Sequence, residues 1–305
     1  MFSYRHAFHA GNHADVLKHL VLIATLRHLM HKSTPLTLVD THAGAGLYRL
    51  DSPAARTSSE AQAGILRLQQ AEGGPRRNPQ ADALADYLAL LARFNPHDAP
   101  WRVYPGSPLL MHALMDEPER AAVHDRLRLF ELHPTDFKTL KAHVAQLQAG
   151  RRVSVERQDG FDALKALLPP PATAGGSRRA VVLIDPSYEI KSDYARVAAA
   201  VQDALRRFAT GVYLVWHPII PRTEAHALPR RLQALARQAG RAWLHVTLDI
   251  GSPPSGGLSA SGMFLINPPH TLHAMLETCL PHVLAVLGQG RGQAWALRHE
   301  PAQSL

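Results

Sequence analysis

The sequence predicts an α/β protein built around a mostly parallel, doubly wound sheet. Segments with the pattern of strands alternate with helical segments along most of the chain, which is typical of this class. The run Ala180–Ile184 is apolar without interruption, as expected for a strand buried on both faces. The strand predicted over Leu36–Asp40 leads into a turn that contains Gly44 and Gly46, as in the first unit of nucleotide-binding folds.

Length and composition indicate a globular protein. The chain has 305 residues, of which 46% are hydrophobic and 19% charged, enough for one large domain or two small ones. It contains no apolar run of about 18 residues, and its N-terminus lacks the pattern of a signal peptide, so we expect no membrane span. Cys279 is the single cysteine, which excludes an internal disulfide. A reducing, cytoplasmic location is expected.

The net charge of +8 favours a polyanionic partner. Basic residues occur as scattered pairs, such as Arg151-Arg152 and Arg206-Arg207. An arginine-rich proteome would give the same excess, so charge alone does not decide between these explanations.

The first strong element is a helix that ends near Met30. Asn12 followed by Asp15 has the spacing of an N-cap pair. Apolar residues cover almost the whole circumference after that, which predicts a well buried helix. Four histidines lie among the first 19 residues: His6, His9, His13 and His19. Zinc sites usually have more closely spaced pairs with cysteine or carboxylate partners, so polar or ligand contacts are favoured and no metal is expected.

The glycine-rich turn after Asp40 does not match a dinucleotide-binding fingerprint. Arg49 occupies the place of the third glycine in G-x-G-x-x-G, which argues against NAD. The turn resembles instead the first motif of S-adenosylmethionine-dependent methyltransferases, where an acid and a G-x-G turn hold the methionine portion.

The next strand of a compact fold would follow within about 20 residues, but the best match is Leu127–Glu131. Helical patterns at Glu60–Ala71 and Ala81–Phe94 occupy the space between. We therefore predict a small helical subdomain at 51–99, inserted into a main domain of residues 1–50 and 100–305. A strand at Trp101–Tyr104 and a turn at Pro105–Pro108 would lead back.

The remaining elements continue the alternation. Strands are predicted at Val153–Glu156, Gly211–Trp216, Trp243–Ile250 and Met263–Asn267. Helices are predicted at Thr139–Gln148, Phe161–Leu168, Tyr194–Phe208 and within Arg222–Gly240.

The segment Asp185-Pro186-Ser187-Tyr188 is the strongest candidate for chemistry. Pro186 ends the preceding strand, which places a carboxylate, a free carbonyl and an aromatic ring at its carboxyl end. Asp185 and the Pro186 carbonyl could accept both hydrogens of an exocyclic amine, and Tyr188 could stack on the ring. The segment resembles the (D/N/S)-P-P-(Y/F/W) motif of amino-group methyltransferases, with Ser187 in place of the second proline. A simple strand-ending turn is the alternative.

A second such motif, Asn267-Pro268-Pro269-His270, also follows an apolar strand. His270 is a poorer stacking partner, and the motif belongs to the last predicted strand. We interpret it as a structural strand end.

Several motifs in one order resemble a known family over nearly the whole chain: SYRHAFHAGNHADVLKH, DTHAGAG, YPGSPLL, ELHP, Asp159-Gly160 and LIDPSYE. The chain is similar to the bacterial large-subunit ribosomal RNA methyltransferase J family. The resemblance implies a Rossmann-like class I methyltransferase with a mostly parallel, seven-stranded sheet whose last strand is antiparallel. It also implies S-adenosylmethionine as cofactor and adenine N6 of 23S ribosomal RNA as target. We expect a monomer.

The resemblance also implies the site residues. Asp185 would be catalytic, together with Pro186 and Tyr188, and Tyr4 would contact the RNA. The cofactor would be bound by His19, His42, Ser107, Glu131, Asp159, Gly160 and Asp185.

Each assignment has a structural alternative. Ser107 could cap a helix that begins at Pro108, Asp159-Gly160 could be an ordinary turn, and Glu131 could be a surface carboxylate. The two histidines could be merely hydrogen-bonded, and Tyr4 could belong to a terminus that orders only on RNA. A DNA adenine methyltransferase and a non-catalytic, basic RNA-binding protein are the alternative functions.

Overall fold

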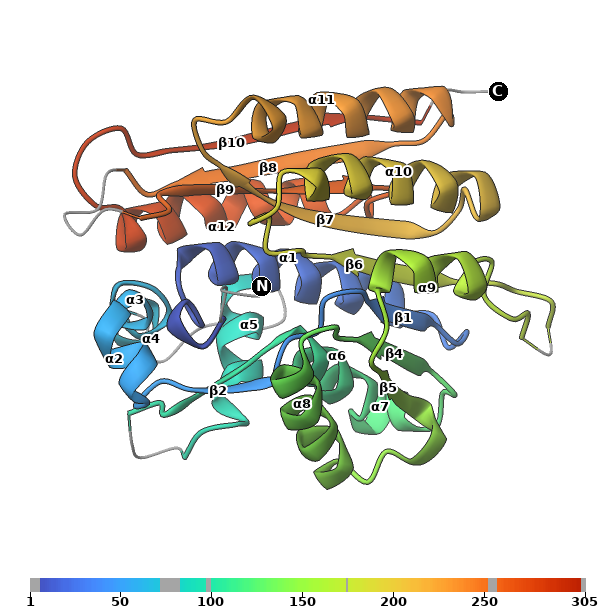
Figure 1. Ribbon diagram of the computed structural model, residues 1–305, viewed down its shortest axis with the longest axis horizontal. Coiled ribbons are helices and arrows are strands. Elements are labelled where there is room, and N and C mark those ends of the chain that lie inside the picture. The colour runs from blue at the N-terminus through green and yellow to red at the C-terminus, as the bar shows by residue number, and fades with distance from the viewer. Residues whose placement is uncertain (1–5, 72–82, 97–99, 174, 252–256, 303–305) are drawn as a thin grey trace.

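A mixed sheet forms the centre of the fold (Figure 1). The computed structural model describes residues 6–71, 83–96, 100–173, 175–251 and 257–302. In this part of the chain the sheet has eight strands in the order β10-β8-β9-β7-β6-β1-β4-β5. Their bounds are β1 Thr37–Asp40, β4 Arg126–Phe130, β5 Val153–Glu156, β6 Ala180–Ile184, β7 Val212–Ile219, β8 Trp243–Asp249, β9 Ala260–Ile266 and β10 Ala294–Glu300.

The five neighbouring strands β5, β4, β1, β6 and β7 are parallel to one another. Strand β9 is antiparallel to both β7 and β8. The prediction of a mostly parallel α/β sheet is confirmed. Its strand count of seven is corrected to eight, because β10 pairs antiparallel with the outer side of β8. This edge strand is only partly buried along its length, so it lacks the continuous apolar run that marked the central strands.

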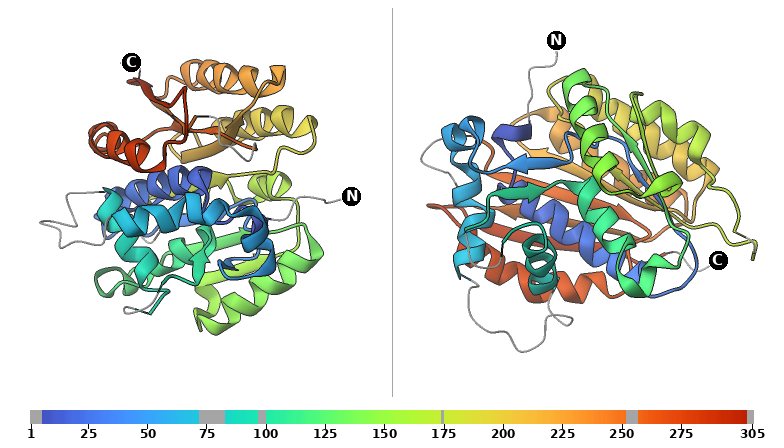
Figure 2. Two further views of the ribbon diagram at one scale, coloured as in Figure 1. Left: turned by 90° about the vertical axis from the view of Figure 1, so that its left-hand side faces the viewer. Right: turned by 90° about the horizontal axis from the view of Figure 1, so that it is seen from below.

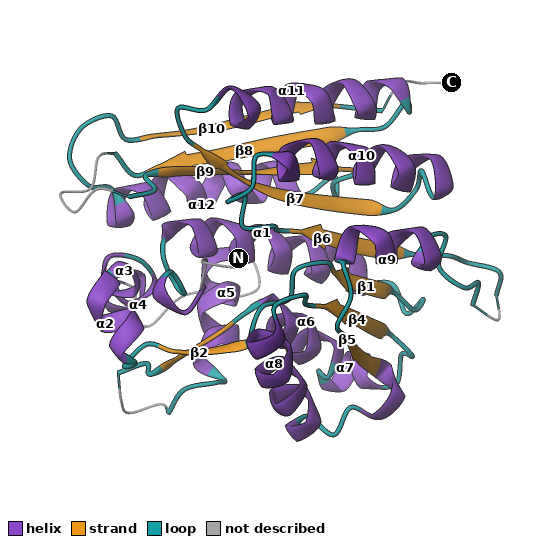
Figure 3. Cartoon of the chain, viewed as in Figure 1, coloured by secondary structure: helices purple, strands orange, loops and turns teal. Residues whose placement is uncertain are grey.

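Helices cover both faces of the sheet (Figure 3). On one face lie α1 His13–Met30, α6 Ser107–Met115 and α12 Leu272–Leu287, and on the other lie α9 Gly160–Leu167, α10 Ser192–Arg207 and α11 Thr223–Gln238. Figure 2 shows α12 and α11 on opposite sides of the sheet. Each face has its own apolar core. Helix α8 Pro134–Gln146 packs on β5 and places Leu140 in the same core as α1, and α7 Pro118–Ala121 follows α6.

Helix α1 confirms the prediction for the N-terminal region. The Asn12 side chain accepts a hydrogen bond from the Asp15 backbone N–H over 2.9 Å, and every residue from His13 to Leu26 is buried. Asp15, Lys18 and His19 are therefore buried with the apolar residues. Buried charges of this kind require partners within the protein.

The segment between β1 and β4 is mostly helical and also contains a short ladder of β2 Leu47–Arg49 with β3 Val103–Pro105. Its helices are α2 Pro53–Ser58, α3 Glu60–Ala63, α4 Ile65–Ala71 and α5 Ala83–Ala92. The helix predicted over Glu60–Ala71 is interrupted at Gly64, where an added Cβ would lie 2.2 Å from the Gly11 carbonyl oxygen. Ile65 and Tyr87 pack in the same core as α1. An inserted subdomain at 51–99 stays a prediction. None of the helices in the described ranges is long and apolar enough to cross a membrane.

Candidate active site

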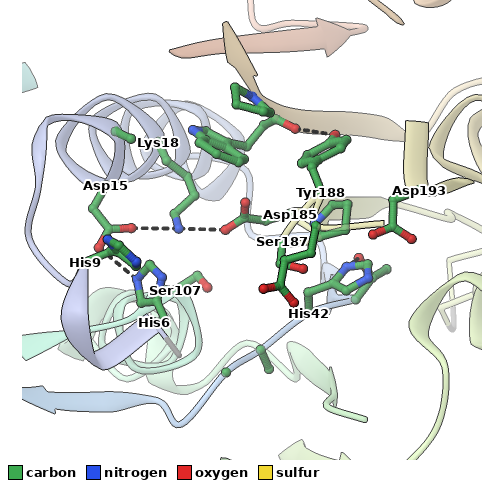
Figure 4. Close-up of a pocket in the computed structure, with 18 of the residues that line it drawn as sticks. His6, His9, Asp15, Lys18, His42, Ser107, Asp185, Ser187, Tyr188 and Asp193 are labelled. Atoms are coloured by element: carbon green, nitrogen blue, oxygen red, sulfur yellow. Dashed lines mark hydrogen bonds and ion pairs between the residues drawn. The ribbon is translucent and has the colours of Figure 1, made fainter. Parts of the chain in front are cut away.

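A cavity of about 620 Å³ opens at the carboxyl ends of the parallel strands (Figure 4). These ends meet at one edge of the sheet, so residues distant in sequence share one site. Nine of the predicted site residues line the cavity: His19, His42, Ser107, Glu131, Asp159, Gly160, Asp185, Pro186 and Tyr188. Tyr4 lies outside the described residues. The structure thus places these residues together, while their individual roles stay predictions.

Glu131 is held between the glycine-rich turn and the segment after β4. Its Oε2 accepts from the Gly44 backbone N–H over 2.8 Å, and its Oε1 accepts from the His133 N–H over 2.7 Å. Gly44 has a φ of 61°, a conformation that glycine adopts readily. Burial raises the pKa of Glu131, although the two backbone hydrogen bonds oppose this. Each carboxylate oxygen keeps acceptor capacity for a ligand in the cavity.

Asp159 and Gly160 form the start of α9. Asp159 caps this helix by accepting from the Phe161 N–H over 3.0 Å, and its other oxygen lies 2.5 Å from the Arg196 guanidinium. An added Cβ at Gly160 would lie 2.1 Å from the Thr41 carbonyl oxygen. The glycine therefore allows α9 to approach the end of β1, and Asp159 is a helix cap that also faces the cavity.

The two histidines of the predicted cofactor site differ in exposure, since His19 is buried and His42 is only partly buried. His19 Nδ1 lies 2.6 Å from the Tyr104 hydroxyl, while its Nε2 is buried without a hydrogen-bond partner within the described chain. Burial, together with the charge of Lys18, holds the pKa of His19 well below its ordinary value. Burial also lowers the pKa of His42 to about 4. Both rings are therefore neutral at pH 7.

Ser107 does not cap a helix that begins at Pro108. Helix α6 begins at Ser107 itself with Gly106 as its N-cap, and the Ser107 hydroxyl donates to Asp40 Oδ2 over 2.6 Å. That part of the alternative interpretation is wrong, because the hydroxyl is used by the buried acid at the end of β1. Burial raises the pKa of Asp40 to about 7, against the opposing hydrogen bonds from Ser107 and the His42 N–H.

Lys18 is a site residue that sequence reasoning missed. Its Nζ lies 2.6 Å from Asp185 Oδ2 and 2.8 Å from Asp15 Oδ1, and Asp15 Oδ2 lies 2.9 Å from His6 Nε2 (Figure 4). Burial would lower the pKa of Lys18, but Asp15 and Asp185 raise it well above its ordinary value. The available signal was an Asp and a Lys three residues apart in a helix that is apolar on all sides.

Tyr188 is placed differently from what a stacking role requires. Its side chain is only 3% exposed, and its hydroxyl donates to the Trp216 carbonyl over 2.6 Å. The ring centroid lies 4.6 Å from that of Tyr194 and 5.9 Å from that of Trp216. The face predicted for stacking is therefore largely covered by protein in this arrangement.

The second proline motif lies outside the residues that line this cavity. Asn267 donates from Nδ2 to the carbonyls of Ala209 and Gly211 over 2.8 and 2.7 Å. Because β9 is antiparallel to β7, its carboxyl end lies at the opposite edge of the sheet from Asp185. The interpretation of this motif as a structural strand end is confirmed.

Three of the four N-terminal histidines contact other side chains of the protein. His6 contacts Asp15, His9 Nδ1 lies 2.8 Å from Glu60 Oε1, and His19 contacts Tyr104. Within the described ranges, no cluster of three or more histidine, cysteine or acidic side chains could hold a metal ion.

Comparisons with known proteins agree with this architecture. Residues 33–297 match the family model described as "Ribosomal RNA large subunit methyltransferase D, RlmJ". Proteins named "Ribosomal RNA large subunit methyltransferase J" from Escherichia coli and Haemophilus influenzae are 40% and 36% identical, with 92% and 97% of this chain and 92% and 98% of theirs covered. A crystal structure of a Legionella pneumophila protein, 29% identical, superposes with a TM-score of 0.77 over 96% of this chain and 98% of that one. The chain therefore belongs to the RlmJ family of ribosomal RNA large subunit methyltransferases.

Proposed function

We propose that the protein transfers a methyl group from S-adenosylmethionine to N6 of an adenine in 23S ribosomal RNA. One observation carries the proposal. Asp185 and Pro186, at the end of β6, share a cavity with the glycine turn after β1 and with Glu131 after β4. A group able to bind an exocyclic amine thus faces a site suited to a nucleoside cofactor. The two relatives named as large-subunit ribosomal RNA methyltransferases support the choice of substrate.

The residues present fit S-adenosylmethionine. The unpartnered Nε2 of buried His19 can bind the polar amino-acid portion, and the unused lone pairs of Glu131 can accept the two ribose hydroxyls. Asp159 can accept the amine of the cofactor's adenine. A cavity of about 620 Å³ is ample for a ligand of this size. When bound, the cofactor supplies an electrophilic methyl group on a sulfonium.

Asp185 and Pro186 would prepare the target amine for attack. The lone pair of an adenine amine is delocalised into the ring, which makes the nitrogen a poor nucleophile. Asp185 Oδ1 and the Pro186 carbonyl can accept its two hydrogens, which favours a pyramidal nitrogen with an exposed lone pair. One N–H proton leaves as the N–C bond forms, and Asp185 is positioned to receive it. Positioning and electrostatics then supply most of the acceleration.

Lys18 fixes the orientation of the Asp185 carboxylate. The lysine occupies Oδ2, so Oδ1 is the oxygen left for the substrate. A carboxylate accepts hydrogen bonds and donates none, so Oδ1 suits an N–H of the target amine.

The target adenine must leave its helix to reach this site. In the structure the Tyr188 ring is covered by Tyr194 and Trp216, so it helps to hold the segment 185–190 in place, and its stacking role stays a prediction. The assignment of Tyr4 as an RNA contact stays a prediction from the family resemblance.

The deciding experiment is transfer of labelled methyl to unmodified 23S rRNA, with duplex DNA of matched sequence as a second substrate. We expect N6-methyladenine in the rRNA alone. Asp185→Ala should lose most transfer while calorimetry shows cofactor binding retained, whereas Tyr4→Ala should mainly raise the KM for RNA. Label in duplex DNA would favour a DNA methyltransferase. Cofactor binding without transfer to either nucleic acid would contradict the proposed substrate and favour a non-catalytic RNA-binding protein.

A further inference from the structure

Large apolar side chains are exposed at one place on the described surface. Phe8, Leu132 and Ile190 are the exposed large hydrophobic residues of the described chain, at 39%, 42% and 60%. Leu132 and Ile190 line the cavity, and Phe8 lies between His6 and His9, which also line it. Single exposed apolar residues are ordinary on protein surfaces, but three around one opening indicate a contact surface.

These three residues occupy different parts of the opening. Leu132 follows Glu131, so it lies beside the position proposed for the ribose of the cofactor, which can cover it. Ile190 lies five residues after Asp185, in the segment that carries the proposed acceptors of the target amine. An extended chain spans at most about 17 Å over that length, so Ile190 lies within reach of the target nucleotide and its neighbours.

Ile190 stands on a segment that is fixed on both sides. Its carbonyl accepts from the Asp193 N–H over 2.9 Å, which joins it to the first turn of α10. Two residues earlier, the Tyr188 ring is buried and its carbonyl accepts from Arg222 over 3.3 Å. The exposed side chain is therefore presented by a backbone that is held in place. A β-branched residue also loses little rotamer freedom when it makes a contact.

We propose that Ile190 is a wedge that enters the RNA base stack at the position from which the target adenine is turned out. Proteins that unstack bases insert apolar side chains of this kind between base steps. Lys191 follows Ile190 directly, and its side chain is 72% exposed. Its Nζ lies 3.9 Å from Glu224 Oε1, a long ion pair that leaves the ammonium group able to contact an RNA phosphate. Glu189 and Asp193 are acidic neighbours that would repel phosphates, so a broad electrostatic contact with RNA is not expected around Ile190. The inference rests on the proposed function, because it names how that site obtains its target.

The wedge predicts a dependence on RNA structure. Methylation of an adenine that is stacked in an RNA helix should depend on Ile190. Methylation of an adenine that is already unpaired and unstacked should depend on it much less. The measurement is kcat/KM on one RNA strand, either alone or annealed so that the target adenine is stacked in a short helix. Ile190→Ala should lower the ratio of helix to single-strand kcat/KM by about tenfold, which is part of the cost of unstacking one base step. Ile190→Leu should keep most of the ratio.

Leu132→Ala is the matched control, since it truncates an exposed apolar residue of the same cavity. It should raise the KM for S-adenosylmethionine equally with both RNAs and leave their ratio unchanged. A second readout is the fluorescence of 2-aminopurine placed at the target position in the helix. The wild-type protein should increase it, and Ile190→Ala should lose most of that increase.

The outcomes separate the two proposals. Transfer by the wild type with the same ratio in Ile190→Ala overturns the wedge and leaves the proposed function intact. The same is true if that variant is impaired only on assembling ribosomal subunits, which would assign Ile190 to a protein partner. Absence of transfer by the wild type to either RNA, despite cofactor binding, overturns the proposed function and the wedge with it.

Discussion

Lys18 Nζ and Asp185 Oδ2 are 2.6 Å apart, although the two residues are separated by 167 positions in the sequence. This contact joins helix α1 to the segment after β6. Lys18 is 6% exposed and also contacts Asp15, so one buried cation lies between two carboxylates. The orientation of the proposed catalytic acid therefore depends on an element at the beginning of the chain.

Replacement of Lys18 by methionine should abolish this arrangement. Asp15 and Asp185 would face each other without a cation, and breaking a buried ion pair costs about 3–5 kcal/mol of folding free energy. We expect a lower midpoint in guanidinium unfolding and a loss of about 100-fold in kcat, as for other changes that misplace a reacting group.

The double variant Lys18→Met/Asp15→Asn separates stability from catalysis. Removal of one carboxylate should restore part of the unfolding midpoint, while kcat should stay low because Asp185 still lacks its partner. Recovery of both quantities would mean that Lys18 acts only through the fold.

Replacement of Glu131 by glutamine should weaken cofactor binding. The carboxylate accepts from the Gly44 and His133 backbone N–H groups, and a glutamine side chain can satisfy only one of them as an acceptor. The amide NH2 also replaces one of the oxygens proposed to accept a ribose hydroxyl. Hydrogen bonds to charged groups contribute about 1.5–3 kcal/mol each, so loss of that one should raise the Kd for S-adenosylmethionine about 10- to 100-fold. Calorimetry measures this, with Glu119→Gln on the surface of α7 as control. An unchanged Kd would remove Glu131 from the cofactor site.

The sequence predicted those parts of the fold that local patterns encode. Strand β6 is buried on both faces and therefore has an unbroken apolar run. The turn after β1 needs glycines for its backbone conformation. Both patterns can be recognised within a single short segment of the sequence. Helix α12 and strand β10 were not predicted. Pro281 interrupts the helical pattern of α12, and β10 is a partly exposed edge strand.

The sequence predicted which residues line the site better than it predicted the contacts that they make. Motif order identified the residues that line the cavity, but contacts between distant segments have no local pattern. The pairing of Lys18 with Asp185, the use of the Ser107 hydroxyl by Asp40 and the covering of Tyr188 by Trp216 all depend on tertiary packing. The lysine had one detectable signal, namely a charge in a helix that is apolar all round.

Replacement of Gly160 by alanine should disturb both the fold and the site. The added Cβ would lie 2.1 Å from the Thr41 carbonyl oxygen, a contact that forces α9 away from the end of β1. Overpacking of this kind costs about 1–3 kcal/mol, and Asp159, the N-cap of α9, would move with the helix. We expect a lower thermal midpoint and a higher Kd for the cofactor. Gly175→Ala, where an added Cβ meets nothing within 4 Å, is the control and should match the wild type.

Acid should destabilise the protein through His217 of β7 and His245 of β8, which meet next to Gly262 of the intervening strand β9. His217 Nε2 lies 3.0 Å from His245 Nε2, and burial lowers their pKa values to about 4 and about 3. Below pH 6.5 the unfolded chain binds protons that the folded chain does not, so the free energy of unfolding falls as pH falls toward 4. For His217 alone, the loss between pH 7 and pH 5 is about 2 kcal/mol. Urea unfolding measures the free energy of unfolding at these two pH values. Its difference between pH 7 and pH 5 should be smaller for His217→Asn than for the wild type. The control His226→Asn, at an exposed position of α11, should match the wild type. Equal differences in all three proteins would show that His217 is not a buried neutral group.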